Sequence, residues 1–166
     1  MCDAPRVLIV DDTPADRDMV EQTATHAEHR YRSLFENLSV AVYRTRMDGT
    51  IVDTNQAFAA LFGWPDPSAA IGQSVVGLYV TPGDREQLLH DLRRMGEVRN
   101  RPVRIRRVNG QEIWIDLSVR VFEDPSGEQV MQGVARDITD ELAVQQRLLL
   151  LASALEAAAD AIVVTD

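Results

Sequence analysis

The dipeptide Asn109-Gly110 constrains the fold more than any other feature of this 166-residue chain. Asn-Gly favours a two-residue hairpin turn, and here it separates Val103–Val108 from Gln111–Phe122. The longer segment alternates apolar residues with others, which is the period of a strand with one buried face. A turn at Asp124–Gly127 leads into Gln129–Arg136, so we expect three hairpin-linked strands. The positions expected to face the core are Ile113, Ile115, Leu117, Val119 and Val121.

The first half of the chain predicts two more strands and the helices. Val40–Arg46 and Ile51–Thr54 flank an Asp-Gly turn, which predicts a second hairpin. Asn55–Phe62 is typical of a short helix, and a longer one is expected from Thr81-Pro82 to Gly96, with Thr81 as its N-cap. This order of elements predicts an α+β domain with a five-stranded antiparallel sheet and helices on one face.

Amphipathic segments flank this domain on both sides. We expect an N-terminal amphipathic helix over residues 26–39, the domain over 40–139 and a linker helix over 140–160. In the linker helix the apolar residues step by four and three, as in the heptad seam of a coiled coil. The two apolar faces consist of Tyr31, Leu34, Phe35 and Leu38, and of Val144, Leu148, Leu151 and Leu155.

All 17 basic residues are arginine, and the chain has no lysine. This excludes the lysine-dependent P-loop, protein-kinase and Schiff-base sites, as well as a working phospho-receiver. The net charge of −9 argues against binding to nucleic acid or to an anionic membrane surface. Cys2 is the only cysteine and Leu148–Ala152 is too short to span a bilayer, so we expect a cytoplasmic protein without disulfides.

Ordered motifs across residues 31–140 resemble those of the PAS sensor family. The resemblance implies the α+β fold expected above and a role in sensing. Tandem PAS domains occur in bacterial histidine kinases and cyclic-nucleotide signalling enzymes, and residues 161–166 look like a strand that starts a second, truncated PAS domain. We therefore expect a fragment of a longer protein with a downstream effector domain. The matching motifs are Tyr31–Asn37, Asp48–Ile51, Asn55–Phe58, Leu61–Trp64, Asn109-Gly110, Ile113–Ile115 and Gly133–Asp140.

The segment Val7–Pro14 resembles the first strand and acidic pair of a response-regulator receiver. In that family the pair, here Asp11 and Asp12, binds magnesium beside a phosphorylated aspartate. The lysine that a receiver requires is absent, as is most of the domain. Residues 1–25 are therefore expected to be a receiver-like remnant or a flexible lead without a metal.

PAS domains often hold a small ligand between sheet and helices. The same residues would also form the plain core of such a domain, so whether a ligand exists, and which, stays open. Haem is argued against because His90 lies beyond the position of the family's haem ligand, and covalent flavin because Cys2 lies outside the core. The candidate lining is Tyr43, Phe58, Phe62, Leu88, Leu92, Ile105, Leu117, Val119 and Met131.

The resemblance also implies that signals pass through the junction of the last strand and the exit helix. Side-chain oxygens of Asp137–Asp140 can bind free N–H groups at the helix start, and a plain helix cap is the alternative interpretation. Trp114 belongs to the outer face of the sheet, which we expect the helix over 26–39 to cover, from the same chain or from a second copy in a homodimer. The relay residues are Trp114, Asp137, Ile138, Thr139 and Asp140.

The resulting expectation is a non-catalytic sensor and dimerisation module of a histidine kinase or diguanylate cyclase. A dimerisation module without ligand is one alternative. A small pocket enzyme is another, although the alternation places its carboxylate candidate, Asp116, on the outer face. His26 and His29 lack a third metal ligand, and Arg99–Arg107 contains the alternation of a strand's solvent face rather than a nucleic-acid site.

Overall fold

The structure, a computed structural model, describes residues 14–163. The chain consists of two compact units that divide after Glu36, and each is described by itself. Most of the receiver-like segment, Val7–Thr13, lies outside the described residues, and so does the end of the second-domain motif, residues 164–166. The remnant and the second domain stay predictions.

The first unit contains helix α1, Pro14–Glu36. This helix begins well before the expected start at residue 26, because Pro14 suits a first helical position and polar helix formers follow it. It ends before Asn37, so residues 37–39, which were expected to be helical, lie outside the helix. The rings of Tyr31 and Phe35 stack with centroids 5.9 Å apart, and Tyr31 and Leu34 are exposed.

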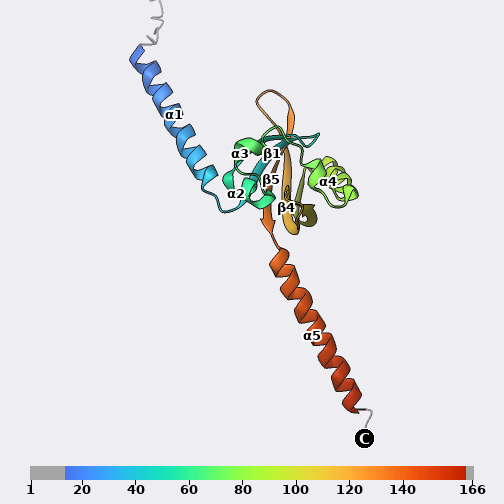
Figure 1. Ribbon diagram of the computed structural model, residues 1–166. Coiled ribbons are helices and arrows are strands. Elements are labelled where there is room, and N and C mark those ends of the chain that lie inside the picture. The colour runs from blue at the N-terminus through green and yellow to red at the C-terminus, as the bar shows by residue number, and fades with distance from the viewer. Residues whose placement is uncertain (1–13, 164–166) are drawn as a thin grey trace, which may run out of the picture. The chain divides into compact units, whose positions relative to one another are not determined.

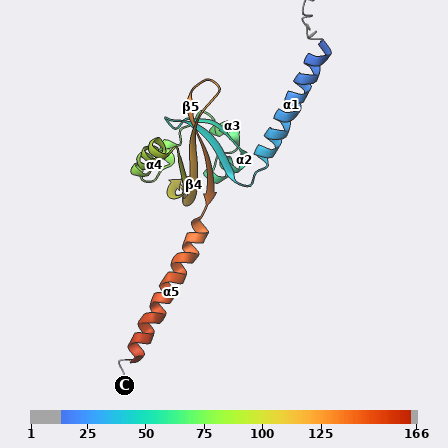
Figure 2. The ribbon, with the colours of Figure 1, turned by 180° about the vertical axis from the view of Figure 1, so that it is seen from behind.

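The second unit is built on the expected five-stranded antiparallel sheet. Its strand order is β2-β1-β5-β4-β3, so the long strand β4 lies between its two hairpin neighbours (Figures 1 and 2). The strands are β1 Ala41–Arg46, β2 Ile51–Thr54, β3 Glu97–Arg106, β4 Glu112–Glu123 and β5 Gln129–Asp137.

Strand β3 begins six residues earlier than Val103, the expected start. Its register with β4 shifts between Val98 and Arg101, and Asn100 in this bulge has a φ of 49°. The Asn100 N–H donates to Ser118 Oγ over 3.0 Å, which replaces a regular ladder bond. The bulge and Pro102 interrupt the strand periodicity, so the sequence pattern did not reveal this part of β3.

Helices cover the inner face of the sheet, where Ile113, Ile115 and Leu117 are buried as expected. They are α2 (Gln56–Phe62), α3 (Pro67–Ala70) and α4 (Pro82–Met95), with a 3-10 turn, η1, at Val76–Leu78. Asn55 caps α2 by accepting from the Phe58 N–H at 3.0 Å. Thr81 occupies the N-cap position of α4 as expected, but its side chain makes no capping hydrogen bond.

Helix α5, Thr139–Val163, follows β5 directly. It continues through residues 161–163, where a strand was expected, because the alanines in this stretch have a high helix propensity. Within the described residues α5 alone is long and apolar enough to cross a membrane, with a mean hydropathy of 1.2, and one such helix is weak support for a membrane protein. Its seam residues Val144, Leu148, Leu151 and Leu155 are 56–72% exposed.

Candidate functional site: the junction of β5 and α5

Hydrogen bonds fix the start of α5 to the first residues of β4. The Ile138 N–H donates to the Trp114 carbonyl over 2.9 Å, and the Trp114 N–H donates to Thr139 Oγ1 over 3.0 Å. The Thr139 N–H in turn donates to Asp137 Oδ1 over 2.9 Å. Ile138 is buried between these polar residues, so backbone and side-chain bonds together connect β4 to the first turn of α5. Four of the five expected relay residues therefore meet here.

Asp140, the fifth expected relay residue, is exposed in the first turn of α5. Together with Glu141 it places negative charge beside the free N–H groups of the helix start, where the helix dipole favours it. Glu141 Oε1 also accepts from Arg136 Nη1 of β5 over 2.6 Å. The strand and the helix are thus joined by side chains as well as by the chain itself.

Arg107 is a member of the junction that the sequence pattern did not reveal. It follows β3, its Nη2 lies 3.1 Å from Asp137 Oδ2, and its Nη1 lies 3.1 Å from Gln111 Oε1. The sequence pattern groups it with the neighbouring arginines on the solvent face of a strand. Its place two residues before Asn109 is the one available signal, because the Asn109-Gly110 turn leads into β4 beside the junction.

The same hairpin connects the junction to the interior. The Val108 N–H donates to the Phe62 carbonyl at the end of α2 over 2.9 Å. Phe62 packs on Phe58 with ring centroids 4.4 Å apart, and Phe58 stacks on Trp64 at 5.7 Å. A continuous series of contacts therefore leads from this aromatic cluster to Asp137 through the adjacent residues Val108 and Arg107.

The nine candidate pocket residues are all buried in one hydrophobic core. Five of them line a small cavity of about 20 Å³, a size that suits a single water molecule. Leu88, Leu92, Val119 and Met131 belong to the core but do not line the cavity. A ligand-binding role for these residues stays a prediction. The cavity lining consists of Tyr43, Phe58, Phe62, Ile105 and Leu117, with Val75, Leu78, Tyr79 and Ile115.

Two phenols make one side of this cavity less apolar than the rest. Burial raises the pKa of Tyr43 well above its ordinary value of 10.0, and burial also raises the pKa of Tyr79. Both side chains are therefore neutral hydrogen-bonding groups at physiological pH. The sequence pattern indicated Tyr43 but not Tyr79, because Tyr79 comes from the irregular segment before α4.

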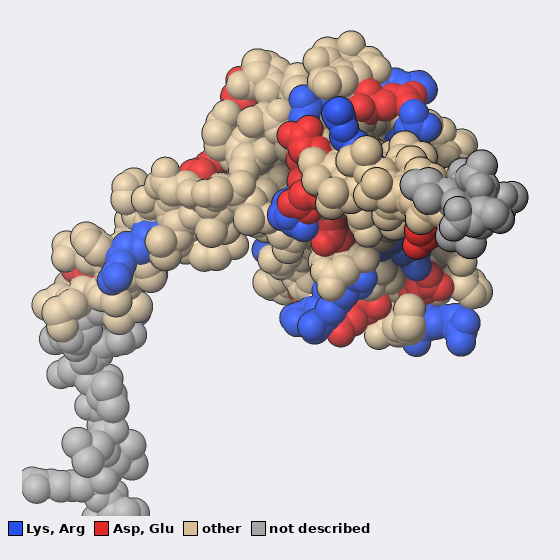
Figure 3. Space-filling view, turned by 90° about the horizontal axis from the view of Figure 1, so that it is seen from below, with Lys and Arg blue, Asp and Glu red and all other residues tan. Residues whose placement is uncertain are grey.

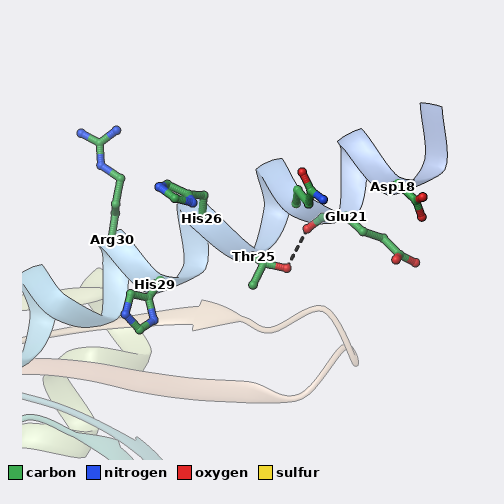
Figure 4. A pocket seen from close by; sticks show the side chains of 7 residues that line it. Asp18, Glu21, Thr25, His26, His29 and Arg30 are labelled. Carbon is green, nitrogen blue, oxygen red and sulfur yellow. Dashed lines mark hydrogen bonds between the residues drawn. The ribbon is translucent and has the colours of Figure 1, made fainter. Parts of the chain in front are cut away.

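The residues weighed for haem or covalent flavin do not fit those cofactors. His90 is exposed on α4, so its imidazole does not face the interior, where a haem iron would lie. Cys2 lies outside the described residues, none of which is a cysteine that could bond a flavin. Figure 4 shows His26 and His29 pointing in different directions from α1, and no group of three potential ligands occurs among the described residues.

The basic run pairs with the protein's own acids. Glu112 forms ion pairs with Arg104 (Nη2 to Oε2, 2.7 Å) and with Arg106 (Nη2 to Oε1, 2.9 Å). Arg101 forms an ion pair with Asp91. Blue and red atoms accordingly alternate on the face drawn in Figure 3. Asp116 pairs in register with Pro102 and Arg136 on the outer face and is only half-buried, as the strand alternation predicts.

Trp114 lies on the outer face of the sheet, and 38% of it is exposed. Ile113 and Ile115 beside it are buried on the opposite face, as expected. Covering of Trp114 by the apolar face of α1 stays a prediction, because that helix belongs to the other unit.

Comparison with known proteins identifies the family. The family model described as "PAS fold" matches residues 29–138. A PAS domain of Colwellia psychrerythraea is 26% identical, with a TM-score of 0.59, covering 69% of this chain and 98% of its own. The PAS domain of an HTR-like protein from Haloarcula marismortui has 24% identity and a TM-score of 0.59, covering 73% and 99% of the two chains.

A domain of a sensory box sensor histidine kinase/response regulator from Geobacter sulfurreducens has 22% identity and a TM-score of 0.54, covering 67% of this chain and 94% of its own. No curated protein sequence matches the chain. The family match spans more than half of the chain, includes the whole sheet and ends at Ile138, one residue before α5 begins. PAS domains are in general non-catalytic sensory modules, and this chain belongs to the PAS-fold family.

Proposed function

We propose that this chain is a cytoplasmic, homodimeric sensor module that relays a change in its core through Asp137–Thr139 into α5. The observation that carries the proposal is the network of Arg107, Trp114, Asp137 and Thr139, which joins the sheet to the helix start. A small shift of β4 relative to β5 would break or realign these bonds. The direction of α5 would change with them, because its first free N–H groups are bonded there.

The partner expected for α5 is the same helix of a second copy. Its seam leaves four apolar side chains exposed, and burying one leucine side chain contributes about 1.5–3 kcal/mol. In α1, Val20, Ala24, Ala27, Tyr31 and Leu34 also step by four and three, which gives the second flank a similar seam.

The output is proposed to reside in an effector domain of the same protein, of the histidine-kinase or diguanylate-cyclase type. Support comes from structural relatives that belong to sensor histidine kinases, such as the Geobacter sulfurreducens domain. A change in the crossing or register of paired α5 helices is a signal that such an effector can receive.

Oligomeric state tests the dimer. We expect the full chain to run as a dimer by light scattering, and a version truncated after Asp140 to associate more weakly. The double variant Leu148→Glu/Leu155→Glu should be monomeric, because it places charges in the seam. Leu150→Glu is the matched control, equally exposed on α5 but off the seam. A full chain that is monomeric at high concentration would refute the dimer.

Amide hydrogen exchange tests the relay. In Asp137→Asn the Thr139 N–H keeps an acceptor, but the ion pair with Arg107 is lost, so exchange of α5 amides near Leu142 should accelerate. Asp124→Asn is the control: Asp124 also accepts backbone N–H groups, but in the turn before β5. Equal exchange at Leu142 in wild type and Asp137→Asn would contradict the relay.

The small interior favours a second candidate function, a dimerisation module without ligand. A cavity of about 20 Å³ admits no organic ligand unless neighbouring residues move. Mass spectrometry of the purified protein under native conditions distinguishes the two, because a sensor with a resident ligand would carry additional mass.

A further inference from the structure

We propose that the core binds a small organic carboxylate, with its charged group on Arg85 and its hydrocarbon part against the aromatic cluster. The inference rests on the proposed sensor function and names the class of ligand that would be sensed. Three features carry it: a buried guanidinium that forms no ion pair among residues 14–163, a glycine that leaves room for this guanidinium, and an adjoining cavity.

Arg85 is the only charged residue in the buried class among the residues that the structure describes, and it is 6% exposed. Its Nη2 donates to the Met47 carbonyl over 3.1 Å, and its guanidinium lies 5.9 Å from the Tyr79 ring centroid. No ion pair to a carboxylate is found for it within residues 14–163. Hydrogen bonds from Thr50 lower the pKa of the exposed Asp48, and the charge of Arg85 contributes to this lowering, but Asp48 forms no ion pair with Arg85. A buried charge without a direct ion-pair partner is costly, so a bound carboxylate would be favoured there.

Gly49 creates the space in which the guanidinium lies. A Cβ at this position would stand 2.9 Å from Arg85 Nη2 and 2.8 Å from Val76 Cγ2. Gly49 also has a φ of 97°, a conformation that favours glycine. The turn between β1 and β2 therefore holds the arginine by its Met47 carbonyl, and the absence of a side chain at Gly49 leaves room for Nη2.

Tyr79 joins the charged group to the cavity. Its side chain lines the cavity of about 20 Å³. Burial raises the pKa of Tyr79, and the charge of Arg85 and a hydrogen bond with it partly oppose this rise. Phe58 and Phe62 line the same cavity. A ligand with a carboxylate at one end and a short hydrocarbon chain at the other matches this change from polar to apolar.

Room for such a ligand requires the segment between α3 and α4 to shift. Two backbone bonds tie this segment beside the site: Val75 N–H to the Gly49 carbonyl, 3.0 Å, and Val80 N–H to the Arg104 carbonyl, 3.1 Å. Val76, which is 46% exposed, lies beside Gly49, since its Cγ2 would stand 2.8 Å from a Cβ at that position. Moving this segment would both widen the cavity and uncover Arg85. Because the cavity starts from only about 20 Å³, we expect the ligand to be a short monocarboxylate.

Titration of the full chain with sodium propionate tests the site, with sodium chloride at equal ionic strength as reference. We expect a saturable rise in Tm with propionate only, and a binding constant for propionamide, the uncharged analogue, at least about tenfold weaker. Arg85→Met should abolish the rise, while the control Arg94→Met, at the exposed end of the same helix, should keep it. The propionamide comparison needs only wild-type protein, so it holds if Arg85→Met does not fold.

Equal effects of propionate and chloride, equal affinity for propionamide, or an unchanged propionate response in folded Arg85→Met would overturn the proposal.

Fluorine NMR of protein with 5-fluorotryptophan distinguishes failure of the carboxylate site from failure of the relay. Trp64 stacks on Phe58 in the core, whereas Trp114 lies in the junction. Propionate that shifts the Trp64 signal alone supports the carboxylate site and refutes the relay. No propionate effect, with an altered α5 in Asp137→Asn, refutes the site and supports the relay.

Discussion

Gly133→Ala is predicted to destabilise the domain by forcing a buried ring out of its place. Gly133 lies on the inner face of β5, paired with Tyr43 of β1. A Cβ there would stand 2.6 Å from Tyr43 Cε1 and closer still to Cζ and the hydroxyl oxygen. Since carbon atoms pack at about 3.5–4.0 Å, the ring would have to move by roughly 1 Å or more.

Two effects of opposite sign decide the magnitude of this change. Alanine in place of a strand glycine lowers the entropy of the unfolded chain, which stabilises by about 0.5–1 kcal/mol. Overpacking of a filled core costs about 1–3 kcal/mol, and the neighbours of Tyr43, such as Phe58 at 5.1 Å between ring centroids, leave it little space. We expect a net loss of about 1–2 kcal/mol in the free energy of unfolding.

Urea denaturation followed by circular dichroism measures this loss. Gly83→Ala in α4 is the control, because a Cβ there meets nothing within 4 Å. It should stabilise by up to about 1 kcal/mol, the helix propensity of alanine over glycine. Tyr43→Leu should relieve part of the Gly133→Ala penalty in the double variant. A Gly133→Ala protein as stable as wild type would refute the packing argument.

Two further predictions concern charge and pH. Asp91→Asn should lower the free energy of unfolding by about 1–2 kcal/mol, because it removes the partner of Arg101 in a mostly buried ion pair between α4 and β3. Glu97→Gln, in the exposed pair with Arg99, should change the free energy of unfolding by less than about 0.5 kcal/mol. Equal effects of the two changes in urea denaturation would contradict this ranking. The pKa of Tyr43 is raised in the folded state, so its contribution to stability is fully present below pH 10.0 and is lost as pH rises above that value. The urea midpoint should therefore fall above pH 10 more steeply in wild type than in Tyr43→Phe, and parallel curves would show that Tyr43 is not the group responsible.

The sheet could be predicted because its information is local. Asn109-Gly110 and the alternation over Ile113–Val121 determine a hairpin without reference to the rest of the chain. The early part of β3 could not, since its pairing depends on a bulge in which the Ser118 hydroxyl replaces a regular partner. The first half of α1 was missed for a similar reason, because an exposed polar helix lacks the apolar period on which the prediction relied.

The candidate site divides in the same way. Asp137 and Thr139 could be predicted as helix-start residues from their types and position, whereas Arg107, thirty positions away, becomes their partner only through the fold. Arg85 stands three residues before Leu88, on the buried face of α4, yet nothing in the sequence indicates that it forms no ion pair within the described part of the chain. The cavity volume depends on how whole side chains pack, which periodicity does not encode.

A double-mutant cycle between Arg107 and Asp137, read from the exchange free energy of the Leu142 amide, tests the relay most directly. The Leu142 N–H donates to the Ile138 carbonyl over 3.0 Å and so reports the first turn of α5. We predict that Arg107→Met and Asp137→Asn are coupled by about 0.5 kcal/mol or more at this amide. Effects of the two changes that simply add, or a Leu142 amide that neither change alters, would mean that α5 is held independently of the sheet.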